Sequence, residues 1–116
     1  MIFNKEKELR DSIIDIGKKL YSLRLVVAKS GNLSCRIDEN KIFITATGTS
    51  LGNLQQEDII KVDLGDSDDC KNPKLTSEFP MHNLIYKNFP NKVILHCHAT
   101  LTNAYFAAYS ELKPLT

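Results

Sequence analysis

The clearest pattern in this chain is a set of apolar positions that recur every three or four residues near the N-terminus. The set consists of Leu9, Ile13, Ile16 and Leu20. Lysine and aspartate residues lie between them, which is the arrangement of a helix with one apolar face. We therefore predict a first amphipathic helix that fades through residues 23–28 and gives way to a turn at Ser30-Gly31.

Short apolar runs separated by turn-forming residues follow this helix. Residues 32–37 and 41–46 flank a turn at 38–40, and together they predict a β-hairpin. Residues 59–64 predict a third strand. The run 65–74 is polar and rich in turn formers, which is typical of an exposed loop.

The remaining segments alternate between helical and extended patterns. A helix is predicted from Thr76 to about Asn88, because a hydroxyl can cap its first turn and a proline is tolerated there. The apolar run 93–95 predicts a buried strand, and residues 99–109 have the composition of another helix. We also expect one helical turn over 54–58. This order of elements implies an α/β layered fold built partly from antiparallel strands.

Composition indicates one small globular domain. The chain has 116 residues, of which 42% are hydrophobic and 25% charged, so we predict a single domain over residues 1–116. Its net charge of +1 is spread along the sequence, which argues against a nucleic-acid or membrane-surface partner. Three widely spaced cysteines, Cys35, Cys70 and Cys97, favour a reducing compartment over a disulfide framework. We therefore predict a cytoplasmic location.

Two histidines one residue apart, His96 and His98, follow the buried strand. Alternate side chains of a strand share a face, so both imidazoles should point one way and Cys97 the other, where it packs as a small apolar residue. An H-x-H on a strand supplies two matched ligands for a zinc ion. The alternative is a pair of half-buried histidines satisfied by hydrogen bonds. We favour metal binding.

Three small polar turns are candidate anion sites. They are Gly31-Asn32, Thr47-Gly48 and Thr76-Ser77. Backbone N–H groups in glycine turns and at helix N-termini bind anions, and hydroxyl groups add further donors, so such turns can together clasp a phosphate. Turns are commonly built from these residues, however, so no single pair indicates a phosphate site.

Glu78 directly follows the last of these turns. A carboxylate there most often interacts with the positive end of the helix, although it could act as a general base if it faced a metal. His82 lies four residues further on, on the same helical face. It could be a packing residue, a partner that orients Glu78, or a spare metal ligand, and we favour packing.

Taken in order, four motifs of the chain resemble the class II aldolase/adducin family. They are G-N-L-S, T-A-T-G-T-S-L-G, K-L-T-S-E-F-P-M-H and V-I-L-H-C-H-A. The resemblance covers nearly the whole chain, and the family includes aldolases, 4-epimerases and dehydratases of phosphorylated sugars. It implies a three-layer α/β/α sandwich with a mixed, mostly antiparallel central sheet, incomplete at its C-terminus in this chain.

The resemblance also implies a role for each motif residue. The phosphate-binding residues would be Gly31, Asn32, Thr47, Gly48, Thr76 and Ser77. Glu78 matches the acid/base glutamate, and His96 and His98 match two of three histidines that bind zinc. In the aldolases the zinc, or another divalent metal, stabilises an enediolate while the glutamate shuttles the proton. The substrate implied is a phosphorylated ketose, and the enzyme implied is a metal-dependent lyase.

Two departures from the family accompany this resemblance. The paired hydroxyl residues are Thr76-Ser77, where two serines are commoner. The family's third histidine ligand lies several dozen residues beyond the H-x-H, and this sequence ends at Thr116. Two ligands hold zinc weakly, so we expect another chain or a longer parent protein to complete the site.

Other activities of the same family remain open. A 4-epimerase or a dehydratase would use the same residues as an aldolase. A non-catalytic assembly module comparable to the adducin head is an alternative of a different class, favoured by the missing ligand. The resemblance further implies a homo-oligomer, commonly a tetramer with active sites at subunit junctions.

Overall fold

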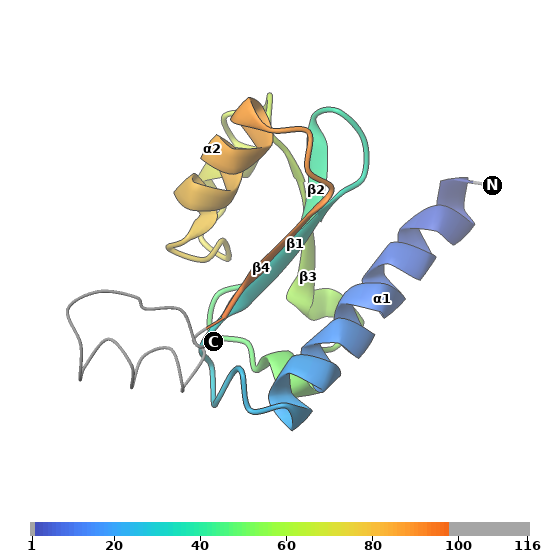
Figure 1. The fold of residues 1–116 in the computed structure, drawn as a ribbon. Helices are drawn as coiled ribbons and strands as arrows, with labels where there is room; N and C mark the ends of the chain where they lie inside the picture. The colour runs from blue at the N-terminus through green and yellow to red at the C-terminus, as the bar shows by residue number, and fades with distance from the viewer. Residues whose placement is uncertain (1, 98–116) are drawn as a thin grey trace, which may run out of the picture.

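The computed structural model describes the backbone of residues 2–97 and the side chains of residues 5–97. Its centre is a four-stranded sheet (Figure 1). The strands are β1 (Asn32–Arg36), β2 (Lys41–Thr45), β3 (Ile59–Asp63) and β4 (Val93–His96). They lie in the order β3-β2-β1-β4, and each neighbouring pair is antiparallel.

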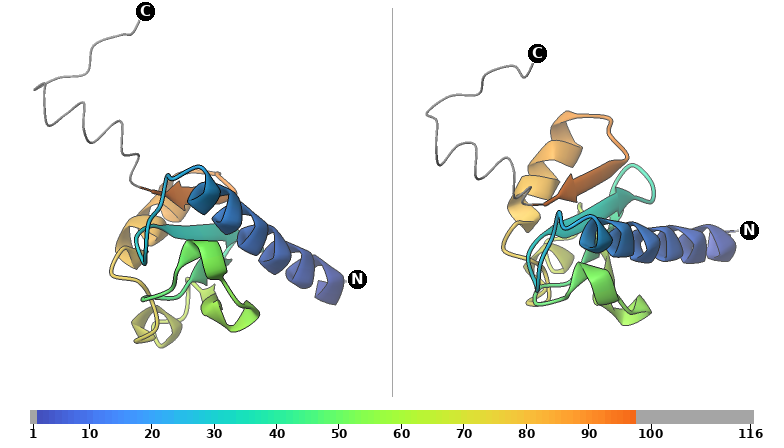
Figure 2. Two further views of the ribbon diagram at one scale, coloured as in Figure 1. Left: turned by 90° about the horizontal axis from the view of Figure 1, so that it is seen from below. Right: turned by 60° about the horizontal axis from the view of Figure 1, so that its bottom comes forward.

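Two α-helices cover the sheet, one on each face (Figure 2). They are α1 (Ile2–Ser22) and α2 (Phe79–Asn88). Three short 3-10 helices lie in the connections: η1 (Leu51–Asn53), η2 (Gln56–Asp58) and η3 (Asp69–Lys71). Because strand side chains alternate between faces, β1 places Leu33 and Cys35 on the α1 side and Ser34 on the α2 side.

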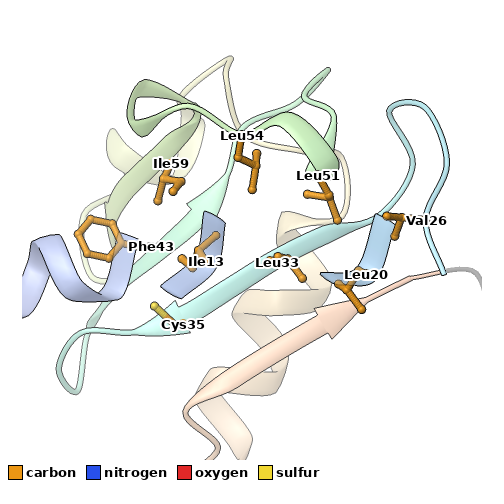
Figure 3. Close-up of a cluster of buried hydrophobic side chains, with 9 residues drawn as sticks. All are labelled: Ile13, Leu20, Val26, Leu33, Cys35, Phe43, Leu51, Leu54 and Ile59. Atoms are coloured by element: carbon orange, nitrogen blue, oxygen red, sulfur yellow. The ribbon is translucent and has the colours of Figure 1, made fainter. Parts of the chain in front are cut away.

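The core between the sheet and α1 is apolar (Figure 3). Its buried members are Ile13, Leu20, Val26, Leu33, Cys35, Phe43, Leu51, Leu54 and Ile59. All four helix positions singled out by the sequence pattern take part: Ile13 and Leu20 are buried members, while Leu9 and Ile16 are partly buried and pack against the cluster. The predicted amphipathic helix is confirmed.

The opposite face of the sheet combines apolar and polar groups under α2. Its buried apolar members are Ile42, Ile44, Val62, Phe79, Tyr86 and Ile94. Beside them lie Asn32, Ser34 and His82, which are also buried. Buried polar groups are costly unless they are hydrogen-bonded, so this face requires specific partners where the α1 face requires only apolar area.

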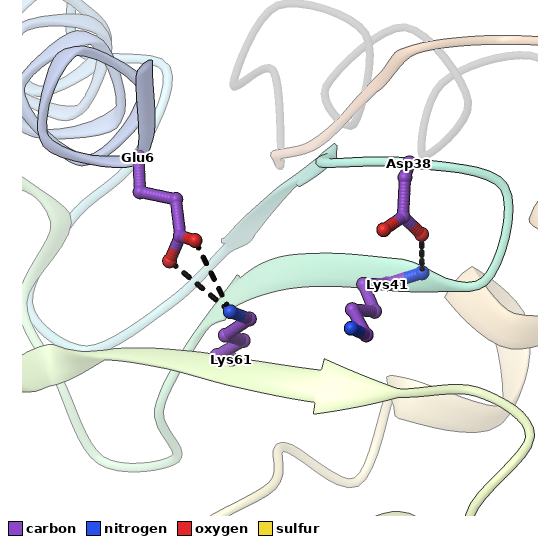
Figure 4. Close-up of polar contacts among 4 residues, drawn as sticks. All are labelled: Glu6, Asp38, Lys41 and Lys61. Atoms are coloured by element: carbon purple, nitrogen blue, oxygen red, sulfur yellow. Dashed lines mark hydrogen bonds and ion pairs between the residues drawn. The ribbon is translucent and has the colours of Figure 1, made fainter. Parts of the chain in front are cut away.

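Polar contacts fix the outer parts of the sheet (Figure 4). The Nζ atom of Lys61 on β3 lies 3.2 Å from the carboxylate of Glu6 on α1. Both side chains are partly exposed to solvent, so this ion pair contributes little to stability. In the β1–β2 turn, the Asp38 carboxylate accepts the backbone N–H groups of Asn40 and Lys41, each at 3.0 Å. The second contact closes the predicted hairpin turn.

The predicted α/β class and antiparallel strands are confirmed, and the mixed character of the complete sheet stays a prediction. The four described strands contain no parallel pair, so the mixed sheet is not found in this part of the chain. One expectation needs correction, because the run 65–74 that was predicted as an exposed loop contains η3. The helix predicted over 99–109 lies outside the described residues. Neither described α-helix combines the length and apolarity required to cross a bilayer.

Candidate active site

A cavity of about 210 Å³ opens where the start of β1, the end of β4 and the N-terminal end of α2 meet. The lining residues are Lys29, Gly31, Asn32, Ala46, Thr47, Gly48, Thr49, Thr76, Ser77, Glu78 and His96. Every predicted site residue within the described chain is among them. His98 lies outside the described residues. A larger hollow of about 700 Å³ beside Arg36 and Tyr86 contains none of the predicted site residues, so size does not identify the site.

Backbone contacts hold two of the predicted turns together. Ala46 forms a β-bridge with Leu75, and the backbone N–H of Thr47 donates to the carbonyl oxygen of Lys74 at 2.7 Å. The Thr49 hydroxyl donates to the Ala46 carbonyl oxygen, also at 2.7 Å. Because the N–H of Thr47 is already used, this residue can offer an anion its hydroxyl group. The turn after β2 therefore lies against the segment that enters α2.

Gly31 brings the start of β1 close to the end of β4. Its φ angle is +84°, in the left-handed region that favours glycine. A Cβ atom there would lie 2.8 Å from Cγ1 of Val26 and 3.0 Å from the carbonyl oxygen of His96. The glycine is therefore needed for both its backbone conformation and its small size, independently of any contact with a ligand.

The entry into α2 is organised by Thr76. Its Oγ1 atom accepts the backbone N–H of Glu78 at 3.2 Å, and its carbonyl oxygen accepts the N–H of Phe79 at 3.0 Å. Pro80 occupies the first turn of the helix. The helix predicted from Thr76 therefore begins later, at Phe79, and no side chain caps it; the Thr76 hydroxyl instead shapes the turn before the helix, in which Ser77 and Glu78 line the cavity.

His96 and Asn32 lie opposite each other on β4 and β1. The Nδ2 atom of Asn32 lies 3.3 Å from Nδ1 of His96, and its Oδ1 atom is hydrogen-bonded to Nε2 of His82. The amide nitrogen carries two hydrogens and the contact with His96 uses one. One hydrogen of the amide is therefore left for the predicted phosphate contact. In the structure, the side chain of Asn32 is hydrogen-bonded to the two imidazoles.

His82 is a fully buried residue whose two ring nitrogens face the sheet. Its Nδ1 atom lies 2.6 Å from the hydroxyl oxygen of Ser34, and its Nε2 atom faces Asn32. Three roles were considered for His82, and its buried position fits packing. The ring is also hydrogen-bonded at both nitrogens. Burial, and to a smaller degree His96, lowers the pKa of His82 to about 4.

The donor types in the cavity suit a divalent metal ion. His96 supplies an imidazole and Glu78 a carboxylate, both of which are zinc ligands in proteins. Within residues 2–97, the His, Cys, Asp and Glu side chains form no group of three that could hold a metal ion. Cys97 packs against the core under α1, so it faces away from this cavity as predicted.

Sequence reasoning missed three of the lining residues, Lys29, Ala46 and Thr49, and of these only Lys29 carries a charge. Its side chain adds a basic group to a lining that otherwise consists of hydroxyl groups, backbone, the Asn32 amide, the Glu78 carboxylate and the His96 imidazole. No local pattern marked Lys29 in the sequence, because its place in the lining depends on the tertiary arrangement around Gly31.

Comparisons with known proteins show the family to which the chain belongs. The Class II Aldolase and Adducin N-terminal domain family matches residues 11–116, and the chain belongs to this family. An L-fuculose phosphate aldolase of Methanococcus maripaludis is 40% identical over 104 residues, which cover 89% of this chain and 56% of that protein. A 3-oxo-tetronate 4-phosphate decarboxylase of Haemophilus influenzae is 34% identical over 100 residues, covering 85% of this chain and 46% of that protein.

A solved structure shares the fold. The crystal structure of an L-fuculose-1-phosphate aldolase from Thermus thermophilus superimposes with a TM-score of 0.74 at 25% identity, over 91% of this chain and 53% of that chain. The chain thus spans about half the length of the relatives it matches. The relatives named here include an aldolase and a decarboxylase, so family membership defines the framework of the site and leaves the reaction to be proposed.

Replacing Gly31 by alanine should destabilise the protein more than the same change at Gly48. Both glycines have positive φ angles, so each alanine incurs a cost of about 1–2 kcal/mol for the left-handed conformation. Only the Cβ at position 31 is crowded, since nothing lies within 4 Å of one at position 48. Crowding should add a further ~1–3 kcal/mol. Urea unfolding curves of the two variants measure the difference, and equal losses would contradict this account.

The pKa of His82 predicts a pH dependence of stability. The folded protein keeps His82 neutral down to about pH 4, whereas the unfolded chain takes up a proton near the ordinary value of 6.5. The contribution is therefore complete above pH 6.5 and is lost as the pH falls toward 4, by up to about 3 kcal/mol. Urea unfolding between pH 7 and 4.5 should show a steeper decline for the wild type than for His82→Gln. Parallel declines would exclude His82 as the source.

Proposed function

We propose that this chain carries the substrate-phosphate and metal-binding part of a metal-dependent lyase that cleaves a phosphorylated ketose. The observation that supports the proposal most strongly is the single cavity that collects the three polar turns, Glu78 and His96. These groups come from segments far apart in the sequence, and turns that merely reverse the chain have no reason to converge on one hollow beside an imidazole.

Part of the cavity lining has the chemistry of a phosphate site. The hydroxyl groups of Thr47, Thr76 and Ser77 supply neutral donors, and the ammonium group of Lys29 supplies charge. The N-terminal end of α2 adds the positive end of a helix dipole, because Ser77 and Glu78 immediately precede this ten-residue helix. Together these groups would bind and orient a phosphate dianion.

The same lining also has the groups for proton transfer beside a carbonyl. His96, and His98 beyond the described residues, would hold the divalent metal, for which we propose zinc. When bound, such an ion supplies positive charge that stabilises negative charge developing on substrate oxygens. Glu78 is the proposed acid/base: its carboxyl group gives a proton to the substrate carbon after the carbon–carbon bond breaks, and takes that proton in the reverse direction.

The remaining features of the proposal follow from family membership. We propose a homo-oligomer, of the tetrameric kind that the resemblance implies, in the cytoplasm. We also propose that the two helices on opposite faces of the sheet belong to a complete three-layer sandwich. Epimerisation, dehydration or decarboxylation could use the same phosphate and metal groups, so the assay must include several phosphorylated sugars.

The substitution Glu78→Gln should abolish cleavage of phosphorylated ketoses while leaving ligand binding intact. Loss of a general acid/base lowers the rate by about 10²–10⁴-fold. The matched control is Glu57→Gln, because Glu57 is exposed and lies outside the cavity. Measured rates with a panel of phosphorylated ketoses, together with Zn²⁺ binding by each variant, test the assignment. A Glu78→Gln variant that cleaves at the wild-type rate would show that this carboxylate is not the acid/base.

Zinc binding separates the lyase from the alternative assembly module. A wild-type chain that binds no Zn²⁺, shows no thermal shift with added Zn²⁺ and cleaves no ketose would overturn the lyase proposal. The non-catalytic adducin-like module would then take its place, supported by the lack of a three-ligand group among residues 2–97.

The substitution Lys29→Met should weaken the binding of inorganic phosphate by about three- to tenfold. A charged donor contributes about 1.5–3 kcal/mol when well buried, and we expect less here because Lys29 is exposed. Isothermal titration with phosphate measures the effect, Lys29→Arg should retain most of the affinity, and Lys18→Met on the outer side of α1 is the control. If Lys29→Met and Lys18→Met bind phosphate equally well, Lys29 does not contact the anion.

A further inference from the structure

A continuous line of polar side chains connects the cavity with the interior of the protein. It runs through His96, Asn32, His82, Ser34 and Tyr86. Asn32 and Ser34 are two residues apart on β1, and His82 and Tyr86 are four residues apart on α2. Residues two apart share one face of a strand, and residues four apart share one face of a helix. The face with Asn32 and Ser34 therefore lies against the face with His82 and Tyr86. The proposed function uses only the outer end of this line.

For the orientation that the Asn32 amide has in the structure, counting hydrogens gives the direction of each bond in the line. The Oδ1 atom of Asn32 can only accept, so Nε2 of His82 donates to it. His82 is neutral and carries one hydrogen, so its Nδ1 atom accepts the Ser34 hydroxyl at 2.6 Å. The Ser34 oxygen then accepts the Tyr86 hydroxyl at 2.7 Å. At the outer end, Nδ2 of Asn32 donates to Nδ1 of His96.

A metal ion on His96 would reverse the hydrogen bond between His96 and Asn32, so that Nδ1 of His96 donates and Asn32 accepts. A neutral imidazole that gives one nitrogen to a metal carries its hydrogen on the other, and that N–H is normally held by an acceptor. Because Nδ1 of His96 faces Asn32, the metal would bind through Nε2 and Nδ1 would donate. Asn32 becomes the acceptor if its amide group turns by half a rotation, which places Nδ2 against Nε2 of His82. The hydrogen of His82 must then reside on Nδ1 and point to Ser34.

We propose that Asn32 is a positioning residue that ties the tautomer of His96 to the tautomer of the buried His82. Ser34 and Tyr86 complete the line, because each hydroxyl group can act as a donor or as an acceptor and so can serve both directions. The tautomer coupling can be examined without a metal. Its consequence for metal binding rests on the proposed function.

The metal-free test is nitrogen-15 NMR of the imidazole rings in the labelled full chain at pH 8. The chain has three histidines, so their signals can be assigned by single substitutions. In the wild type we expect the hydrogen on Nε2 in both His82 and His96. In Asn32→Asp the carboxylate accepts from both rings, so His96 should move its hydrogen to Nδ1 while His82 keeps it on Nε2. An unchanged His96 tautomer in this variant overturns the proposal.

The metal test adds Zn²⁺ to the same samples. Binding to the wild type should move the hydrogen of His82 from Nε2 to Nδ1, although His82 itself does not touch the metal. Asn32→Leu should lower the Zn²⁺ affinity by about 10- to 100-fold, as is typical when a partner of a metal ligand is lost, and Asn32→Asp should restore it. Equal affinities of Asn32→Leu and the wild type, or a His82 ring unchanged by bound Zn²⁺, overturn the positioning role.

A matched control distinguishes positioning from a general effect of core substitution. Thr45→Val removes another buried hydroxyl group, on β2, which accepts the backbone N–H of Leu33 at 3.0 Å and lies outside the line. It should cost stability while both tautomers and the Zn²⁺ affinity stay at wild-type values.

If Asn32→Leu does not fold, Asn32→Asp alone decides the coupling. If the wild type binds no Zn²⁺, the metal proposal fails and the metal-free comparison still decides the coupling.

Discussion

The contact between β1 and α2 is the constraint on which the candidate site depends. At the end of β1, the Arg36 guanidinium donates to the carbonyl oxygens of Tyr86 at 2.9 Å and Phe89 at 3.1 Å, and it stacks on the Tyr86 ring. At the start of the strand, Asn32 is hydrogen-bonded to His82. A shift of the helix by one turn would leave these buried polar groups without partners, so one strand fixes both ends of one helix.

This register determines which groups meet at the cavity. Asn32 follows the crowded turn at Gly31, and Glu78 lies one helical turn before His82 on the same side of α2. The pairing of β1 with β4 then places His96 opposite Asn32. Once Asn32 and His82 are bonded, the turn, the carboxylate and the imidazole are held at a common edge of the sheet.

The two faces of the sheet contribute in different ways. Under α1 the buried side chains are apolar, and apolar burial stabilises a fold without specifying direction (Figure 3). Under α2 the apolar cluster is joined by Ser34 and His82, both fully buried. Members of one family with different reactions can share this framework, because the reaction depends on the residues that line the cavity and not on the two cores.

The sequence by itself determined the elements and the candidate residues. The spacing of Leu9 to Leu20 predicted α1, the alternation around residues 38–40 predicted the hairpin, and the order of four short motifs indicated the family. These signals are local, or are read in order along the chain. Only the tertiary structure decided that Lys29 lines the cavity and that Asn32 joins His82 to His96, since strand pairing and helix packing bring together residues that no local pattern relates.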